Sequence, residues 1–167
     1  MAETIEQYVA RILGYAGDRD PLEILKSSPR RLESLIVGRT RYELARKPDD
    51  GKWSVVEILA HLADSEIVGA WRFRSILAAN GTPLQAYDQN AWAATFRYAD
   101  TDAFESQRLF ETTRASNLAL LKRVDPSLHA NYGMHEERGR ESLEHLIRLY
   151  AGHDLNHIGQ IERLLRS

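Results

Sequence analysis

The chain has 167 residues, of which 43% are hydrophobic and 28% are charged, and its formal net charge is −2. This composition predicts one globular domain over residues 1–167 with a substantial core, and the weakly acidic balance argues against nucleic-acid binding. The sequence contains no cysteine, which excludes disulfides, iron–sulfur ligation, cysteine-bound zinc and a cysteine nucleophile.

The N-terminal residues 1–6 are acidic and lack the apolar core of a signal peptide. No apolar run approaches the roughly 20 residues that a membrane-spanning helix needs. We therefore expect a cytoplasmic protein that has neither a membrane nor a nucleic acid as its partner, and that acts on a small molecule.

The first third of the chain is predicted to be helical but broken. Apolar residues recur at helical spacing over 4–14. The pairs at 20–21 and 28–29 each place proline directly after a capping residue, which is typical of a helix start. A further capping box at 40–43 indicates one or two more turns.

The rest of the chain predicts three longer helices. A capping box at 54–57 opens one that extends to about residue 79, and the others cover 103–123 and 141–166. Residues 83–100, with one turn at 90–94, and the polar segment 126–140 are predicted to be loops, and no strand pair is indicated. The predicted class is all-α: a four-helix bundle with extra short N-terminal helices and long connecting loops.

Three histidines are candidates for one shared site. His153 and His157 lie four residues apart in the proline-free last helix, so they share its apolar face. His61 lies on the inward side of the 54–79 helix. Three neutral imidazoles that converge in a bundle form a transition-metal site, whereas a single core histidine usually has an ordinary hydrogen-bond partner. Because one unsatisfied buried polar group costs about 1–3 kcal/mol, three together favour a shared ion.

Further polar residues are candidates for roles around this site. Asp64 follows His61 by three residues and is predicted to orient an imidazole or to act as a base, with a surface charge as the alternative. For Glu57, helix capping is the better interpretation, and Gln160 is expected on the inward side of the last helix. His145 is interpreted as structural, and His129 and His135 are expected in a loop, where no periodicity indicates a role for them.

Three residues are predicted to shape a substrate or cofactor pocket. Tyr87 and Trp92 lie in the long segment between the second and third long helices, and Arg114 lies close to the apolar side of the third. The alternative for Arg114 is a long side chain that buries its stem and extends its guanidinium to solvent.

The Lys-Trp-Ser start at 52–54, the segment 57–66 and the His-Asp-Leu-Asn-His run at 153–157 together resemble the DinB-like (YfiT-like) superfamily. The similarity extends over nearly the whole chain. It implies a four-helix bundle, often a homodimer, in which His61, His153 and His157 bind a divalent metal. Characterised relatives include S-transferases and isomerases that use low-molecular-weight thiols, and many members are called metal-dependent hydrolases.

Three hypotheses follow for the function. The first is an S-transferase in which a divalent transition metal (zinc or nickel foremost, iron or copper also suited) binds a low-molecular-weight thiol, since the chain has no thiol of its own. The second is a hydrolase that uses metal-bound water, with Asp64 or another carboxylate as the base. The third is a metal-containing stress or ligand-binding protein without turnover.

Overall fold

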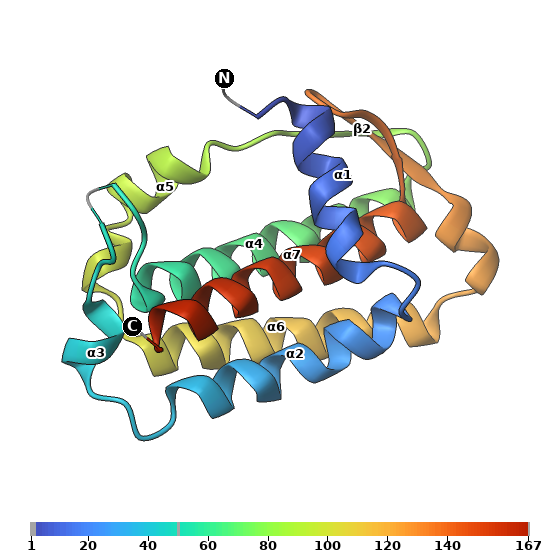
Figure 1. Ribbon diagram of the computed structural model, residues 1–167. Coiled ribbons are helices and arrows are strands. Elements are labelled where there is room, and N and C mark those ends of the chain that lie inside the picture. The colour runs from blue at the N-terminus through green and yellow to red at the C-terminus, as the bar shows by residue number, and fades with distance from the viewer. Residues whose placement is uncertain (1–2, 50, 167) are drawn as a thin grey trace.

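Four long helices form a closed bundle in the computed structural model, which describes residues 3–49 and 51–166 (Figure 1). Each of the four packs against two others, since α4 and α2 each contact both α6 and α7. The predicted four-helix bundle is thereby confirmed. The long helices are α2 (Pro21–Ile36), α4 (Val55–Ala78), α6 (Ala103–Arg123) and α7 (Leu143–Leu164).

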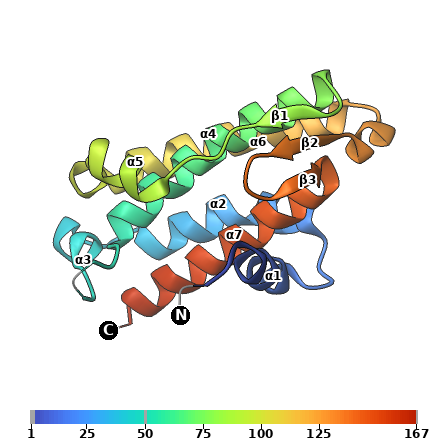
Figure 2. The ribbon, with the colours of Figure 1, turned by 90° about the horizontal axis from the view of Figure 1, so that it is seen from above.

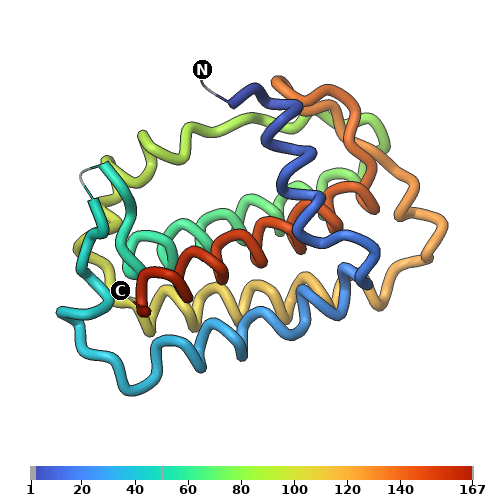
Figure 3. The backbone as a smooth tube through the Cα atoms, viewed as in Figure 1, coloured from blue at the N-terminus to red at the C-terminus, as the bar shows by residue number. Residues whose placement is uncertain are grey.

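The neighbouring helices α4 and α6 run in the same direction, and α2 and α7 run in the opposite one (Figure 3). Because two parallel neighbours cannot be joined by a short turn, the chain crosses the molecule between them. This connection contains β1 (Thr82–Leu84), α5 (Gln89–Thr95) and the 3₁₀ turn η1 (Tyr98–Asp100). Figure 2 shows it passing over α4, while α1 (Ile5–Ala16) lies over α7.

A small sheet corrects the expectation of a loop without strands over residues 126–140. β2 (Tyr132–His135) pairs in parallel with β1 and antiparallel with β3 (Gly139–Ser142). Strands of three or four residues are too short for an alternating pattern to appear in the sequence, and one partner lies about 50 residues upstream. The other short elements are α3 (Arg41–Ala45) and η2 (Pro126–Ala130).

The helix α2 is continuous through Pro29, so the predicted break at this proline is wrong. Proline has no N–H to donate to the carbonyl four residues earlier, which is that of Leu25. In the structure this carbonyl oxygen accepts a hydrogen bond from Arg114 Nη1 at 2.9 Å instead. A side chain from α6 therefore replaces the missing backbone bond, which no local pattern around Pro29 reveals.

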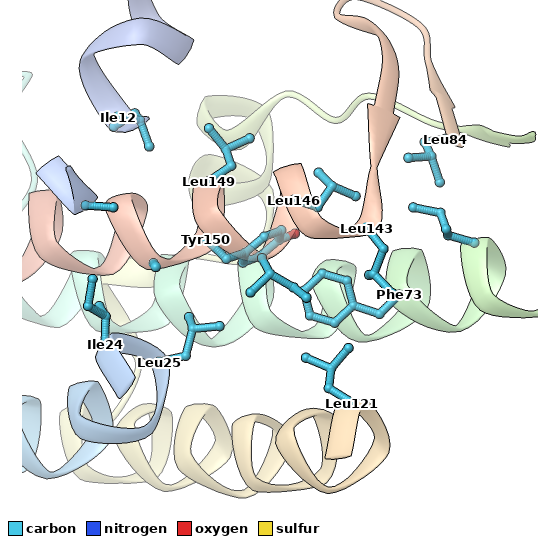
Figure 4. Packing of buried hydrophobic residues seen from close by; sticks show 14 residues of the cluster. Ile12, Ile24, Leu25, Phe73, Leu84, Leu121, Leu143, Leu146, Leu149 and Tyr150 are labelled. Carbon is cyan, nitrogen blue, oxygen red and sulfur yellow. The ribbon is translucent and has the colours of Figure 1, made fainter. Parts of the chain in front are cut away.

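The apolar core consists of two clusters at the two ends of the bundle. One gathers residues of α1, α2, α4, α6 and α7, among them Leu25, Phe73 and Leu146 (Figure 4). The other includes Phe110 and Ile158. Within the described part of the chain no helix is long and apolar enough to cross a membrane.

A buried polar layer centred on Arg114 lies between the two clusters. Its guanidinium is bound by Glu66 of α4 at 2.8 and 2.9 Å and by Asp154 of α7 at 2.6 and 3.1 Å. Together with the bond to Leu25, these contacts use all five N–H groups of the guanidinium. Asn117 donates a further bond to Glu66 at 2.7 Å. Arg114 thus joins all four bundle helices and does not extend to solvent, since it is only 2% exposed.

Replacing Arg114 by methionine is expected to destabilise the fold by about 3–5 kcal/mol, because Glu66 and Asp154 would stay buried without a counter-charge. Chemical denaturation of the variant and the wild type measures the difference. Arg140→Met is the matched control, since Arg140 is exposed and its guanidinium lies over the Tyr132 ring, away from the polar layer. A loss below about 1 kcal/mol for Arg114→Met would contradict this account of the polar layer.

Candidate metal centre

The structure brings the three predicted histidines together between α4 and α7. The Nε2 atom of His153 lies 3.1 Å from Nε2 of His61 and 3.1 Å from Nε2 of His157. All three ligating atoms lie within 4.8 Å of one another. Each ring is nearly enclosed, with exposed fractions of 1% for His61, 9% for His153 and 7% for His157.

The capping box at the start of α4 sets the position of His61. The Ser54 hydroxyl accepts from the backbone N–H of Glu57, and the Glu57 carboxylate accepts from the backbone N–H of Ser54 at 2.8 Å. Lys47 also binds Glu57 at 2.8 Å. Glu57 therefore fixes the first turn of α4, as predicted, and His61 follows one turn later on the same face.

A close approach of two backbones sets the position of the other two histidines. A Cβ atom on Gly152 would lie 2.0 Å from the carbonyl oxygen of Ile12, so only glycine lets α1 lie directly against α7 at this point. The next residue along α7 is His153. The N-terminal helix is thus packed onto the turn that begins the histidine pair.

The distances and the protonation of the three rings fit a divalent transition metal. Nitrogen ligands about 2.0–2.1 Å from one ion lie about 2.9–3.4 Å from each other, which matches the two separations of 3.1 Å. Burial lowers the pKa of His157 to about 4, and burial with the neighbouring imidazoles lowers the pKa of His61 and His153 well below the usual value. All three rings are therefore neutral at pH 7, which is the ligating form.

The surroundings of the Nδ1 atoms of His157 and His61 also favour metal binding. Nδ1 of His157 lies 2.8 Å from Oε1 of Gln160, and because a carbonyl oxygen only accepts, Nδ1 carries the proton and Nε2 keeps its lone pair. Nδ1 of His61 is buried without a partner among the described residues, while the Trp53 ring packs 5.0 Å from the imidazole. A shared cation accounts for three ring nitrogens that face one point.

Two cavities adjoin the histidines. The larger, of about 720 Å³, is lined by His61 and His153 and lies between the two central helices, α1 and the start of the connection that leads into α5. The second, of about 650 Å³, is lined by His157 together with Trp53. Both cavities include Tyr8 of α1 and Gln89 and Asn90 of α5 in their walls, so the two cavities are neighbours.

The other predicted site residues occupy three different environments. Tyr87 lines the larger cavity, and Trp92 stacks on it with ring centroids 4.6 Å apart. Asp64 accepts a hydrogen bond from the Tyr98 hydroxyl at 2.5 Å, and Arg114 belongs to the buried polar layer. The catalytic role of Asp64 and the cofactor roles of Tyr87, Trp92 and Arg114 stay predictions.

Arg72 and Tyr150 also line the larger cavity, and the sequence did not point to either of them as a site residue. Arg72 follows His61 by eleven residues, close to three helical turns, so the spacing alone places both on one face of α4. Tyr150 precedes His153 by three residues, and its helical spacing with the apolar residues of α7 indicates only a core position. His135, for which the sequence indicated only a loop position, is buried, and its Nε2 atom lies 3.1 Å from Nη2 of Arg72.

The fold and the site together define a four-helix bundle with a buried cluster of three histidines between two antiparallel helices, which could hold a metal ion. The sequence profile of the DinB superfamily matches residues 24–161. The chain belongs to the DinB superfamily.

The relatives and the fold agree with this assignment. The protein named "Putative metal-dependent hydrolase YfiT" from Bacillus subtilis is 26% identical over 146 residues, which cover 87% of this chain and 82% of the relative. The protein named "Putative metal-dependent hydrolase OB0782" from Oceanobacillus iheyensis is 25% identical over 142 residues, which cover 85% of this chain and 82% of the relative.

The solved structure of Bacillus subtilis YfiT is similar with a TM-score of 0.82 and 26% identity, covering 87% of this chain and 84% of that one. It is described as a probable metal-dependent hydrolase with an unusual four-helix bundle topology. The parallel pairing of α4 and α6 described above is compatible with such a topology.

Replacing His153 by alanine is expected to remove most of the bound metal, since His153 lies between the other two ligands. Elemental analysis of protein purified without an affinity tag measures the metal per chain. His145→Ala on the same helix is the control and should keep wild-type metal, because His145 lies nearest to Glu141 at 3.8 Å. Metal content in His153→Ala equal to that of the wild type would refute the three-histidine site.

The metal-free protein is expected to lose stability as the pH falls from 6.5 towards 4. The pKa of His157 is about 4 in the fold and about 6.5 when unfolded, so over this range the unfolded chain binds the extra proton. The loss from this one group is on the order of 3 kcal/mol and is complete only below pH 4. Denaturation of the wild type and of His157→Gln at several pH values isolates the contribution of this histidine. An equal pH dependence of stability in both proteins would disprove that contribution.

Proposed function

We propose that this protein is a metal-dependent enzyme and that its reaction is the transfer of a low-molecular-weight thiol to an electrophilic substrate. The observation that carries the proposal is the arrangement of two cavities around one histidine cluster. A transfer reaction needs two small molecules next to one reacting centre, and two adjoining cavities provide room for both. The absence of cysteine means that the sulfur has to come from a bound molecule.

The histidines hold the metal in this proposal. A divalent cation bound by three imidazoles lowers the pKa of a coordinated thiol or water and leaves coordination positions open for it. Gln160 keeps the lone pair of His157 directed at the site, and the Trp53 ring limits the movement of His61. Their contribution is to fix the imidazoles before any ligand arrives.

The walls of the larger cavity supply neutral hydrogen-bonding groups. Burial raises the pKa of the Tyr8, Tyr87 and Tyr150 hydroxyls, so each remains protonated at neutral pH and is able to donate to a substrate. Tyr87 in turn interacts with Ser65, which lies on α4 one turn after His61. These groups orient a polar substrate without adding charge next to the metal.

A metal-dependent hydrolase is the second candidate, and the names of the relatives from Bacillus subtilis and Oceanobacillus iheyensis favour it. In this case Asp64 is the proposed base. Its carboxylate is already bound by the Tyr98 hydroxyl, whose pKa is raised by burial and by Asp64 itself. Asp64 would therefore have to exchange this partner for a water molecule during the reaction.

Assays of the metal-loaded protein separate the two candidates. We expect conversion of an electrophile such as 1-chloro-2,4-dinitrobenzene only when a thiol from a low-molecular-weight panel is supplied. His153→Ala should lose this activity and His145→Ala should keep it, and product formation is followed by absorbance. Cleavage of ester or amide substrates without thiol would replace the transferase by the hydrolase. Retention of ligands without turnover in either panel would indicate a binding protein.

A further inference from the structure

The larger cavity contains a buried arginine that forms no ion pair with any carboxylate in the described part of the chain. Arg72 of α4 is 5% exposed and lines the same cavity as His61 and His153. Its Nη2 atom donates to the carbonyl oxygen of Gln85 at 2.7 Å and lies 3.1 Å from Nε2 of His135. Within residues 3–49 and 51–166 no carboxylate lies close enough to form an ion pair with it.

The contrast with the second deeply buried arginine shows how unusual this is. Arg114 is 2% exposed, and two carboxylates compensate its charge. A buried charge without a partner is unfavourable by several kcal/mol, so an arginine in a core normally has such a partner. The partners that the described residues offer Arg72 are neutral, since burial together with Arg138 and Arg72 lowers the pKa of His135 to about 4.

The structure keeps the guanidinium of Arg72 next to a phenol that also faces the metal centre. The Tyr150 hydroxyl interacts with Arg72, and the Tyr150 ring centroid lies 6.5 Å from that of His153. Gly69 makes this placement possible, because a Cβ atom there would lie 2.8 Å from the Tyr150 ring. His61, Gly69 and Arg72 occupy one face of α4, so the arginine and the metal centre face the same space.

The other charged groups around this cavity are already engaged or lie at its mouth. Glu3 pairs with Arg11, Arg138 pairs with Glu141, and the Asp88 carboxylate caps the N-terminus of α5. Glu137 is exposed. Among the residues that the structure places around this cavity, the unpaired positive charge therefore belongs to Arg72.

We propose that Arg72, with the Tyr150 hydroxyl beside it, binds a carboxylate of the small molecule that reacts at the three-histidine centre. A guanidinium presents paired N–H groups that match the two oxygens of a carboxylate, and such charge-assisted bonds are strong in a desolvated site. This inference rests on the proposed function for the reacting end of the molecule. It adds that the substrate class is anionic, with its carboxylate and its reacting group at opposite ends of one chain.

The separation of the two anchors makes the proposal measurable with a molecular ruler. Eleven helical residues separate the backbones of His61 and Arg72 by about 16 Å, and the arginine side chain points back towards the start of the helix, which shortens this span. A short ligand is able to reach only one anchor. Affinity should therefore pass through a maximum as the chain between carboxylate and metal-binding group is lengthened.

The test uses ω-mercaptoalkanoic acids of increasing length and their neutral amides, with binding to the zinc-loaded protein measured by calorimetry. At the best length the acid should bind at least about tenfold more tightly than its amide, as expected for one charge-assisted contact. Arg72→Gln should reduce this ratio to about one, and Arg72→Lys should give an intermediate ratio. Arg140→Gln, an exposed arginine outside the cavity, should keep the wild-type ratio, and thermal unfolding checks that each variant is folded.

A second pair without sulfur, an alkanoic acid and its amide, separates this inference from the thiol proposal. An acid preference that depends on Arg72 in this pair, with no binding of thiols to zinc, would support the anion site and refute the thiol transferase. Thiol binding with the same acid-to-amide ratio in wild type and Arg72→Gln would overturn the anion site and leave the transferase standing. Failure of every acid to bind would also overturn it, and if Arg72→Gln does not fold, Arg72→Lys decides.

Discussion

The contacts of Arg114 determine how the rest of the bundle is placed. One guanidinium on α6 binds a carboxylate on α4, a carboxylate on α7 and a backbone carbonyl on α2. Those carboxylates are not distributed at random, since Glu66 follows His61 by five residues and Asp154 directly follows His153. A slip of one residue along either helix would move a ligand by about 1.5 Å and turn it by about 100°. The network that fixes the register of α4 against α7 therefore also fixes the distances between the imidazoles.

The sequence reveals much of the candidate site because its histidines follow helical spacing. His153 and His157 share a face because they lie four residues apart in one helix, and the capping box at Ser54 marks the start of the helix that carries His61. The polar layer is not readable in this way, because Arg114 finds its partners 48 and 40 residues away in the chain. For the same reason Pro29 predicts a helix start, whereas a side chain of α6 allows α2 to continue through it. Contacts of this kind exist only once the helices are packed.

The two buried arginines also show that the sequence does not reveal contacts between packed helices, here for residues with different proposed roles. Both lie on long helices among apolar neighbours, so periodicity assigns both to the inside and distinguishes neither. Only packing shows that Arg114 has two carboxylate partners and that Arg72 has none within residues 3–49 and 51–166. A network with every group satisfied stabilises a fold, whereas an uncompensated charge beside a cavity opposes folding and suits a ligand that brings the missing charge. The unfavourable buried charge thus lies at the cavity where the proposed reaction takes place.

The direction of the helices explains why a cavity exists above the histidines at all. Since α4 and α6 run parallel, the chain must return along the whole length of α4 before α6 begins (Figure 3). This return places Tyr87 and Asn90 opposite the face that carries His61, and α1 closes the side above α7. A bundle with short turns between antiparallel neighbours would leave that face to solvent or cover it with another helix. The long segment, which lacks clear periodicity in the sequence, is thus the consequence of the topology and the wall of both cavities.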